Sequence, residues 1–322
     1  MPHTISVIIP VKNGADTLAR CLAAVRQQTG VEIVQIVVLD SASTDNSVAI
    51  AKEYGAEVVP VAPADFNHGL TRNLGAAIAT GNLIYFTVQD AAIAEPDMLH
   101  KMAAHFNDTL VQGVVGIQGI PERTDTNPAL WFRRYTQPVI EKRYYPNGRF
   151  EQLTEKKQFE LSNWDDVNAM YRKSALQQIP FRETNFSEDW LWANEALKAG
   201  MKIIRDPSLM VYHYHHLYFS YVLSTQYIVN YYFQVYFQQL PHFPSLFKPL
   251  MQRTYTLFAK RKLPITQKCY WVFHNGLALL ANLLSVCIFR LLYALGKEKG
   301  IKQGYQLICK KVPQGTLRTV AE

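Results

Sequence analysis

Three side chains that could do chemistry stand where predicted strands end or a helix begins. Asp90 follows the apolar run at 83–88, Asp189 opens a helical pattern at 188–200, and His213 follows the last apolar strand. A carboxylate and an imidazole at separate strand ends can share a divalent cation, completed by phosphate oxygens and water. Each also has an ordinary alternative, either a favourable dipole partner at a helix start or a packed, hydrogen-bonded edge.

The loop at 66–73, with the sequence FNHGLTRN, could also bind a ligand. Gly69 allows close approach of the backbone, and His68, Arg72 and Asn73 supply donors where a helix begins. This combination suits phosphate or sugar hydroxyl groups. The alternative is a capped turn without a ligand.

Apolar strands alternate with helical patterns in the first part of the chain. Amphipathic segments start at Thr17, Ser47 and Leu70, between short runs rich in β-branched residues at 5–9, 34–39, 57–61 and 83–88. This alternation predicts an α/β fold with a mostly parallel sheet covered by helices. Further strand- and helix-like runs extend it at 114–119, 166–173, 188–200 and 201–216. The aperiodic stretch 122–157 predicts a long loop with short helices that covers a site.

The sheet edge where these strands end is the expected ligand side. Residues 11–13 follow the first strand and Asp40 ends the second, so they should lie side by side at the carboxyl edge. Asp40 could there accept hydrogen bonds from a base or ribose, or it could simply belong to a turn or helix cap. No GxGxxG sequence follows the first strand, which argues against an NAD site.

The formal net charge of +7 over 322 residues is unevenly spread. Residues 207–322 hold 13 Lys and Arg against two acids, a difference of +11, and no acid lies between Asp206 and Glu298. Together with Tyr, Phe and Leu, this charge favours a membrane surface over nucleic acid, for which no binding motif is present. A homodimer interface is the alternative for the aromatic residues.

The cysteines, the N-terminus and one long uncharged run indicate where in the cell the protein is expected. Four scattered cysteines form no CxxC pair, and the N-terminus is a strand pattern without a signal-peptide core, so we expect a cytoplasmic protein peripheral to the inner face of the membrane. Residues 269–289 carry no formal charge and are long enough to span a bilayer. His274, Asn275, Asn282 and Ser285 interrupt this run, which favours helices that lie in the interface or pack together over a true span.

The motifs, taken in chain order, resemble those of the family 2 glycosyltransferases, and FNHG with QDA resembles the bacterial rhamnosyltransferases among them. They are SVIIPVKNGADTL, VVLDSASTDNS, GLTRNLGAAIATGNLIYFTVQD, NFSEDW and VYHYH, all within residues 4–216. The resemblance implies a glycosyltransferase A-type fold in residues 1–216, with a nucleotide-binding half continuous with an acceptor half. Residues 217–322 would then form a helical region that associates with a membrane or oligomerises.

The resemblance implies a donor-binding set at the sheet edge and in the loop at 66–73. Asp40 falls where the family holds the nucleoside, and Arg72 falls on the arginine that reaches toward the base. The full donor-binding set is Pro10, Val11, Asp40, His68, Arg72 and Gln89.

It also implies a metal ion and a base. Asp90 matches the second acid of the family's DxD metal motif, and His213 matches the histidine that can complete the metal shell, so Mg²⁺ or Mn²⁺ is implied as cofactor. Asp189 matches the catalytic base. We expect Glu188 beside it to be a positioning residue, because adjacent residues at a helix start point about 100° apart and cannot both face one hydroxyl. Val88 stands where the first DxD acid is expected. This departure removes a usual ribose or metal contact of the family.

These roles imply an inverting transferase that moves a sugar from a nucleoside diphosphate to an acceptor hydroxyl. The expected donor is dTDP-L-rhamnose, and the expected acceptor is a lipid-linked glycan of the bacterial surface. A UDP- or GDP-sugar stays open as donor, and a non-catalytic glycan-binding or scaffold protein stays open as function. A nucleotidyltransferase would need a glycine-rich, basic phosphate loop after the first strand, which PVKNGAD is not.

Overall fold

The structure, a computed structural model, describes residues 3–131 and 138–309 of the chain. It divides into two compact units, residues 1–119 with 133–214, and residues 120–132 with 215–322. The segment 120–132 therefore groups with the C-terminal helices, whereas a division at residue 216 would place it in the first part of the chain.

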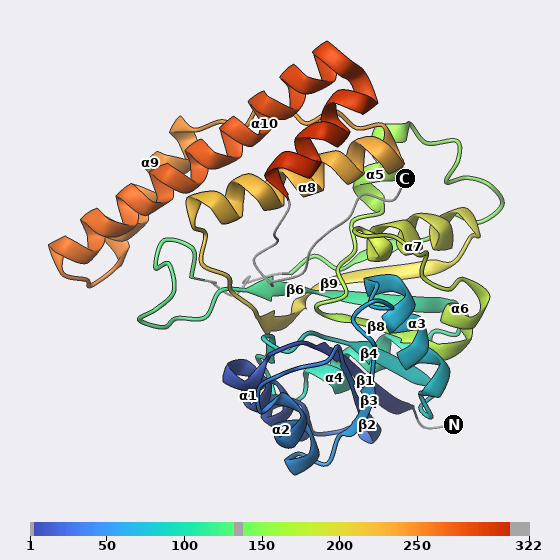
Figure 1. The fold of residues 1–322 in the computed structure, drawn as a ribbon. Coiled ribbons are helices and arrows are strands. Elements are labelled where there is room, and N and C mark those ends of the chain that lie inside the picture. The colour runs from blue at the N-terminus through green and yellow to red at the C-terminus, as the bar shows by residue number, and fades with distance from the viewer. Residues whose placement is uncertain (1–2, 132–137, 310–322) are drawn as a thin grey trace. The chain divides into compact units, whose positions relative to one another are not determined.

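A nine-stranded mixed sheet forms the centre of the first unit (Figure 1). Its first four strands are parallel and run in the order β3 (Glu57–Pro60), β2 (Glu32–Asp40), β1 (Thr4–Val11) and β4 (Leu83–Phe86). All four match predicted strands. The carboxyl ends of these strands meet at one edge, which is where ligand-binding groups collect in open α/β sheets.

The other half of the sheet mixes directions. β8 (Ala169–Arg172) pairs antiparallel with β4 and with β6 (Val111–Gly119), and β9 (Lys202–Tyr212) runs parallel to β6. β5 (Ala92–Ile93) and β7 (Glu141–Arg143) are short strands antiparallel to β9. The predicted loop at 122–157 therefore contains a strand, β7. Two of the three residues of β7 are exposed, so the sequence shows no apolar strand pattern there. Residues 132–137 of the predicted loop lie outside the described part of the chain.

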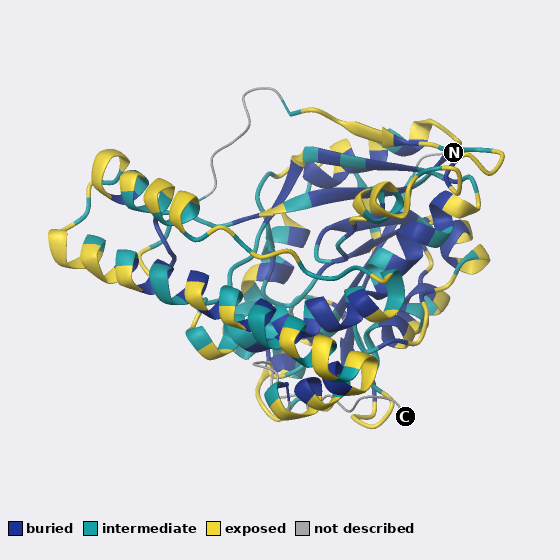
Figure 2. Cartoon of the chain, turned by 90° about the horizontal axis from the view of Figure 1, so that it is seen from above, coloured by how far each residue is buried: buried dark blue, intermediate teal, exposed yellow. Residues whose placement is uncertain are grey.

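Helices cover both faces of the sheet. One face carries α1 (Ala15–Arg26), α2 (Ser47–Glu53), α4 (Met98–Ala104) and the 3-10 turn η1 (His105–Asn107). The other carries α3 (His68–Ile78), α5 (Glu155–Leu161), α6 (Lys173–Gln178) and α7 (Glu188–Lys198). Figure 2 shows the buried strands in dark blue and the outer sides of the helices in yellow.

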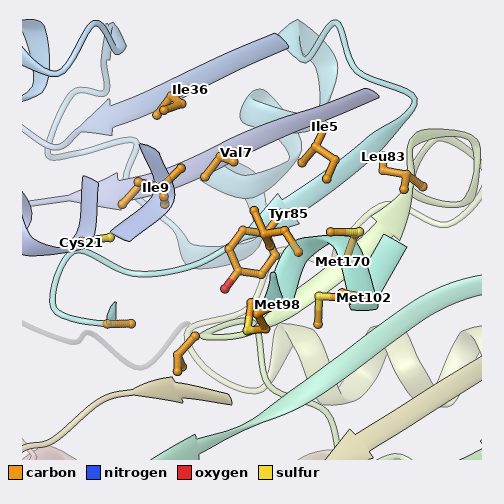
Figure 3. Packing of buried hydrophobic residues seen from close by; sticks show 14 of the residues in the cluster. Ile5, Val7, Ile9, Cys21, Ile36, Leu83, Tyr85, Met98, Met102 and Met170 are labelled. Carbon is orange, nitrogen blue, oxygen red and sulfur yellow. The ribbon is translucent and has the colours of Figure 1, made fainter. Parts of the chain in front are cut away.

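Alternation along the strands produces the two cores. Ile5, Val7 and Ile9 of β1 pack on the α1 side, and Ile8 packs on the opposite side. Figure 3 shows the first three in one cluster with Tyr85 of β4 and Cys21 of α1. The predicted α/β architecture is confirmed, since the strands are buried on both faces.

The second unit is helical. It contains α8 (Phe219–Phe237), α9 (Phe247–Tyr255), the π-helical turn η2 (Thr256–Lys260) and α10 (Ile265–Ile308). α8 and α10 lie side by side (Figure 1), and Tyr227 of α8 donates a hydrogen bond to the carbonyl of Ile301 at 3.1 Å. α10 breaks at Lys297, where φ is 48°. Among the described residues it is the one helix long and apolar enough to cross a membrane, which by itself is weak evidence for a span.

Candidate active site

The ends of β1 and β2 present a buried carboxylate at the sheet edge. Val11 pairs with Asp40 in the parallel register, so the expected neighbourhood is confirmed, and Pro10 pairs with Leu39. Asp40 is 6% exposed; its Oδ2 accepts a hydrogen bond from the backbone N–H of Ser43 at 3.1 Å. Its Oδ1 is buried without a partner among the described residues. A buried oxygen in this state is destabilising until a donor reaches it, so this atom is suited to receive an N–H or O–H group of a ligand.

The loop after β1 is held in place by side chains from two other loops. The backbone N–H groups of Asn13 and Gly14 donate to Ser43 Oγ at 2.9 Å and Ser47 Oγ at 2.8 Å. The amide of Gln89 binds the backbone of Lys12 twice, accepting from its N–H at 2.8 Å and donating to its carbonyl at 3.1 Å. Gln89 therefore shapes the edge of the site, with its amide turned to the chain itself.

Asp90 and His213 meet at the same end of the sheet, with 3.3 Å between Asp90 Oδ1 and His213 Nε2. The other ring nitrogen, Nδ1, lies 2.6 Å from Gln118 Oε1, and the amide nitrogen of Gln118 donates to Asp165 Oδ2. While Asp165 is ionised it can only accept, so Gln118 turns its carbonyl to His213 and keeps the ring proton on Nδ1.

That arrangement leaves a lone pair on His213 Nε2 directed at a carboxylate oxygen. Two acceptors this close are stabilised either by protonation of the ring or by a cation between them. The donor set of one carboxylate oxygen and one imidazole nitrogen fits a divalent cation of the Mg²⁺ or Mn²⁺ type. His215, two positions further along the chain, is a third residue of a metal-ligating type.

Arg72 lies in a buried cluster with two acids. Its guanidinium is 2.5 Å from Glu188 Oε1 and 3.2 Å from Asp166 Oδ2, and the residue is 5% exposed. Tyr171 donates its hydroxyl to Asp166 Oδ1 and accepts from Trp164 Nε1 at 2.6 Å. In this structure Arg72 thus faces two carboxylates of its own chain, and its expected contact with a base stays a prediction.

Asp189 belongs to the same cluster. Its Oδ1 accepts from the N–H of Trp190 at 2.7 Å and its Oδ2 from the N–H of Asp166 at 3.3 Å. Burial, followed by the charges of Glu188 and Asp166, raises the pKa of Asp189 well above its ordinary value. Burial likewise raises the pKa of Asp166 to about 7. A carboxylate with a raised pKa is a stronger base than an ordinary one, which is what proton abstraction requires.

Asp165 and Asp166 join the two clusters, and sequence reasoning missed both. Asp165 contacts Gln118, which contacts His213, while Asp166 contacts Arg72 and Asp189. One available signal was a pair of acids directly before an apolar strand, since the chain reads WDDVNAMYR there.

The loop at 66–73 is largely engaged with its own chain. Asn67 caps α3, accepting from Gly69 N and Leu70 N at 3.0 and 3.1 Å, and donates to Thr184 O at 2.8 Å. Asn73 exchanges two hydrogen bonds with the backbone of Phe181, at 2.8 and 2.9 Å. The loop therefore anchors the segment that leads into Glu188 and Asp189.

Gly69 and His68 complete this loop. A Cβ on Gly69 would collide with the carbonyl oxygen of Arg182, so the close backbone approach expected at Gly69 is made to the chain itself. The half-buried ring of His68 lies edge-on to Phe66, with 5.0 Å between centroids, and its role toward a donor sugar stays a prediction.

Val88 is the residue of the VQD triplet that replaces the first acid of the DxD motif, and its packing shows where that position points. Its side chain packs against the hydrophobic core on the α1 side, and its carbonyl accepts from Cys21 Sγ at 3.4 Å. An aspartate in the same orientation would turn its charge into that core. The valine therefore leaves the contact between Asp90 and His213 intact.

The family model described as "Glycosyl transferase family 2" matches residues 6–180. The O-antigen chain rhamnosyltransferase RfbN of Salmonella typhimurium is 31% identical over 218 residues, 66% of this chain and 66% of that protein. The O-antigen chain rhamnosyltransferase WbaN of Salmonella anatum is 30% identical over 214 residues, 65% of this chain and 66% of the relative. The matches thus cover slightly less than two thirds of the length of these relatives.

Two solved structures share the fold at low identity. The mannosyltransferase PcManGT from Pyrobaculum calidifontis, in complex with GDP-Man and Mn²⁺, has a TM-score of 0.54 at 16% identity and covers 96% of this chain and 84% of its own. Residues 1–349 of TarS from S. aureus, in complex with UDP, have a TM-score of 0.52 at 18% identity, with 95% and 90% covered. They support the glycosyltransferase A-type architecture. With more than half of its residues matched by the family model, the chain belongs to glycosyl transferase family 2.

Proposed function

We propose that this protein transfers a sugar from a nucleoside diphosphate to a hydroxyl group of a growing bacterial polysaccharide, with L-rhamnose from dTDP-L-rhamnose as the first choice of donor. The observation that carries the proposal is the continuous set of contacts from Asp90 and His213 through Asp165 and Asp166 to Asp189. It links a metal-type pair and a carboxylate of raised pKa at one end of the sheet. The two rhamnosyltransferase relatives support the choice of sugar.

Asp189 is the proposed base. As the acceptor oxygen attacks the anomeric carbon, the bond from that carbon to the diphosphate breaks and the hydroxyl proton passes to the Asp189 carboxylate. Glu188 is held by Arg72, so it serves to position Arg72 and the start of α7. Asp40 is the proposed acceptor of a hydrogen bond from the nucleoside, because its Oδ1 is buried and unsatisfied among the described residues.

Asp90 and His213 would hold the divalent cation. When bound there, the cation supplies charge neutralisation for the departing diphosphate. Gln118 contacts the other ring nitrogen of His213, an outer contact that would orient Nε2 toward the cation.

We further propose that the acceptor is lipid-linked and that the protein works at the cytoplasmic face of the membrane, because the C-terminal third is strongly basic and rich in aromatic residues. A UDP- or GDP-sugar is the competing donor. A non-catalytic glycan-binding role is disfavoured, because Asp189, Asp90 and His213 are all present and all engaged in one set of contacts.

Purified protein incubated with a panel of nucleotide sugars and Mg²⁺ or Mn²⁺ tests the proposal. The correct donor should raise the free energy of unfolding by about 2.7 kcal/mol at one hundred times its dissociation constant. It should also release its nucleoside diphosphate by slow hydrolysis. Stabilisation by UDP- or GDP-sugars alone would transfer the proposal to those donors, and the absence of any response would refute it.

A further inference from the structure

The helix formed by α9 and η2 leaves one side uncovered within the second unit. None of the nine residues of α9 is buried. Four large apolar side chains follow at intervals of four, four and three residues, which places them on one side of the helix. They are Phe247, Met251, Tyr255 and Phe258, and their exposed fractions lie between 46% and 77%. We call these four residues the α9 apolar face; Leu257, by contrast, is fully buried.

Basic side chains accompany this face. Residues 247–268 contain six Lys and Arg and no acid. The ammonium of Lys260 lies 5.5 Å from the ring centre of Tyr255, and that of Lys268 lies 5.4 Å from the ring centre of Phe258. Apolar and aromatic side chains with cations beside them match the boundary of an anionic bilayer, where rings enter the headgroup level and ammonium groups meet phosphates.

We propose that the α9 apolar face and the lysines beside it form the surface through which this protein binds an anionic lipid bilayer. This membrane surface deepens the proposed function. It depends on that function in one respect: a lipid-linked acceptor would lie in the same membrane. A second copy of the chain fits this face poorly, because a twofold interface would bring the same lysines together.

α10 carries a second exposed apolar row that serves as a comparison. Leu280, Leu284, Leu291 and Leu295 recur at intervals of four, seven and four residues and are 37% to 77% exposed. Arg290 is the one charged residue between Leu280 and Leu295. This row offers similar apolar area with fewer cations along it, since Lys297 and Lys299 follow only beyond its end and Glu298 lies between them, so it separates an electrostatically assisted surface from general hydrophobic adhesion.

Co-sedimentation of the full-length protein with vesicles of phosphatidylcholine, with and without phosphatidylglycerol, is the test. The test variant is Phe247→Ser with Tyr255→Ser, whose native side chains are 77% and 60% exposed. The matched control is Leu291→Ser with Leu295→Ser, whose native side chains are 58% and 77% exposed. Binding should require phosphatidylglycerol and weaken as salt is raised. The α9 variant should bind at least about tenfold more weakly, because each buried aromatic side chain contributes about 1.5–3 kcal/mol. The α10 variant should bind as the unmodified protein does.

Three results would overturn the assignment: full binding by the α9 variant, an equal loss in both variants, or a change in molecular mass of the α9 variant without vesicles, which would make this face a protein interface. Circular dichroism and melting temperature establish that both variants fold. Hydrolysis of the nucleotide sugar in solution is measured in parallel, since the α9 face lies in the helical unit and its variant should retain this activity. Vesicle binding that follows the pattern in a protein that hydrolyses no donor would leave the surface standing and refute the proposed activity.

Discussion

Replacing Asp189 with asparagine should abolish sugar transfer without lowering stability. Asparagine keeps the shape of aspartate but has no basic oxygen, so it cannot take the proton of the acceptor hydroxyl. Loss of a general base typically lowers the rate by about 10²- to 10⁴-fold. Donor binding should persist, because the proposed nucleoside contact is made by Asp40 on β2 and the proposed cation ligands are Asp90 and His213.

The stability of the same variant follows from the raised pKa of Asp189. A carboxyl group whose pKa is higher in the folded than in the unfolded chain destabilises the fold above that pKa, by about 1.36 kcal/mol for each pKa unit. Asparagine removes this penalty. Its amide can still accept from Trp190 N, at 2.7 Å, but it loses the longer bond from Asp166 N, at 3.3 Å, which costs about 1 kcal/mol. At pH 8 the free energy of unfolding should therefore be no lower than that of the unmodified protein.

The assay combines transfer rate, donor affinity by calorimetry, and urea unfolding at pH 8. Glu183→Gln is a suitable control, because it neutralises an exposed carboxylate six positions earlier in the same segment. Transfer by Asp189→Asn at nearly the unmodified rate would show that Asp189 is not the base. A clear loss of stability, or an equal loss in the control, would show that the contacts of this cluster are misjudged.

Three further substitutions probe the rest of the site. Asp90→Ala should weaken donor binding in Mn²⁺ at least about tenfold, as EDTA should for the unmodified protein; calorimetric binding indifferent to both would remove the cation from the mechanism. The contribution of Asp166 to the free energy of unfolding should fall by about 1.4 kcal/mol from pH 6 to pH 8, because its carboxyl, whose pKa is raised from 3.8 to about 7, holds a proton in the folded but not the unfolded chain. Asp166→Asn should flatten this dependence in urea titrations, and equal slopes would contradict the assignment. Gly69→Ala should cost about 1–3 kcal/mol in thermal unfolding through its clash with Arg182, whereas Gly276→Ala, whose Cβ meets nothing within 4 Å, should be harmless.

The strands could be predicted because they are buried on both faces. The runs at 5–9 and 34–39 became the centres of β1 and β2, whose side chains alternate between two cores. Asp90, His213 and Asp189 could be singled out as candidates for a related reason: each stands at or just beyond the end of a strand or helix, and such ends meet at one edge of the sheet.

The partners of Arg72 could not be predicted, because they depend on how distant segments return to the sheet. Glu188 is 116 positions further along the chain, and Asn67 finds Thr184 at a separation of 117. In the sequence, glycine and polar residues at the start of α3 suit a ligand loop and a structural anchor equally well. Asn67 and Asn73 find partners within the chain because residues 181–184 lie beside α3. These contacts in turn fix the segment that leads into α7.

The adjacent pair Asp165–Asp166 matters more to the site than its sequence signal suggests. One residue contacts Gln118, which orients the His213 ring, and the other contacts Arg72 and the proposed base. Four acidic side chains, those of Asp165, Asp166, Glu188 and Asp189, lie close enough to Arg72 for its positive charge to act on each of them. A donor with an anionic diphosphate would meet these acidic groups, so a cation bound beside Asp90 would offset the repulsion from the acids that raise the pKa of the proposed base. The proposed cation ligands and the proposed base would therefore depend on each other electrostatically, although they lie on different strands and helices.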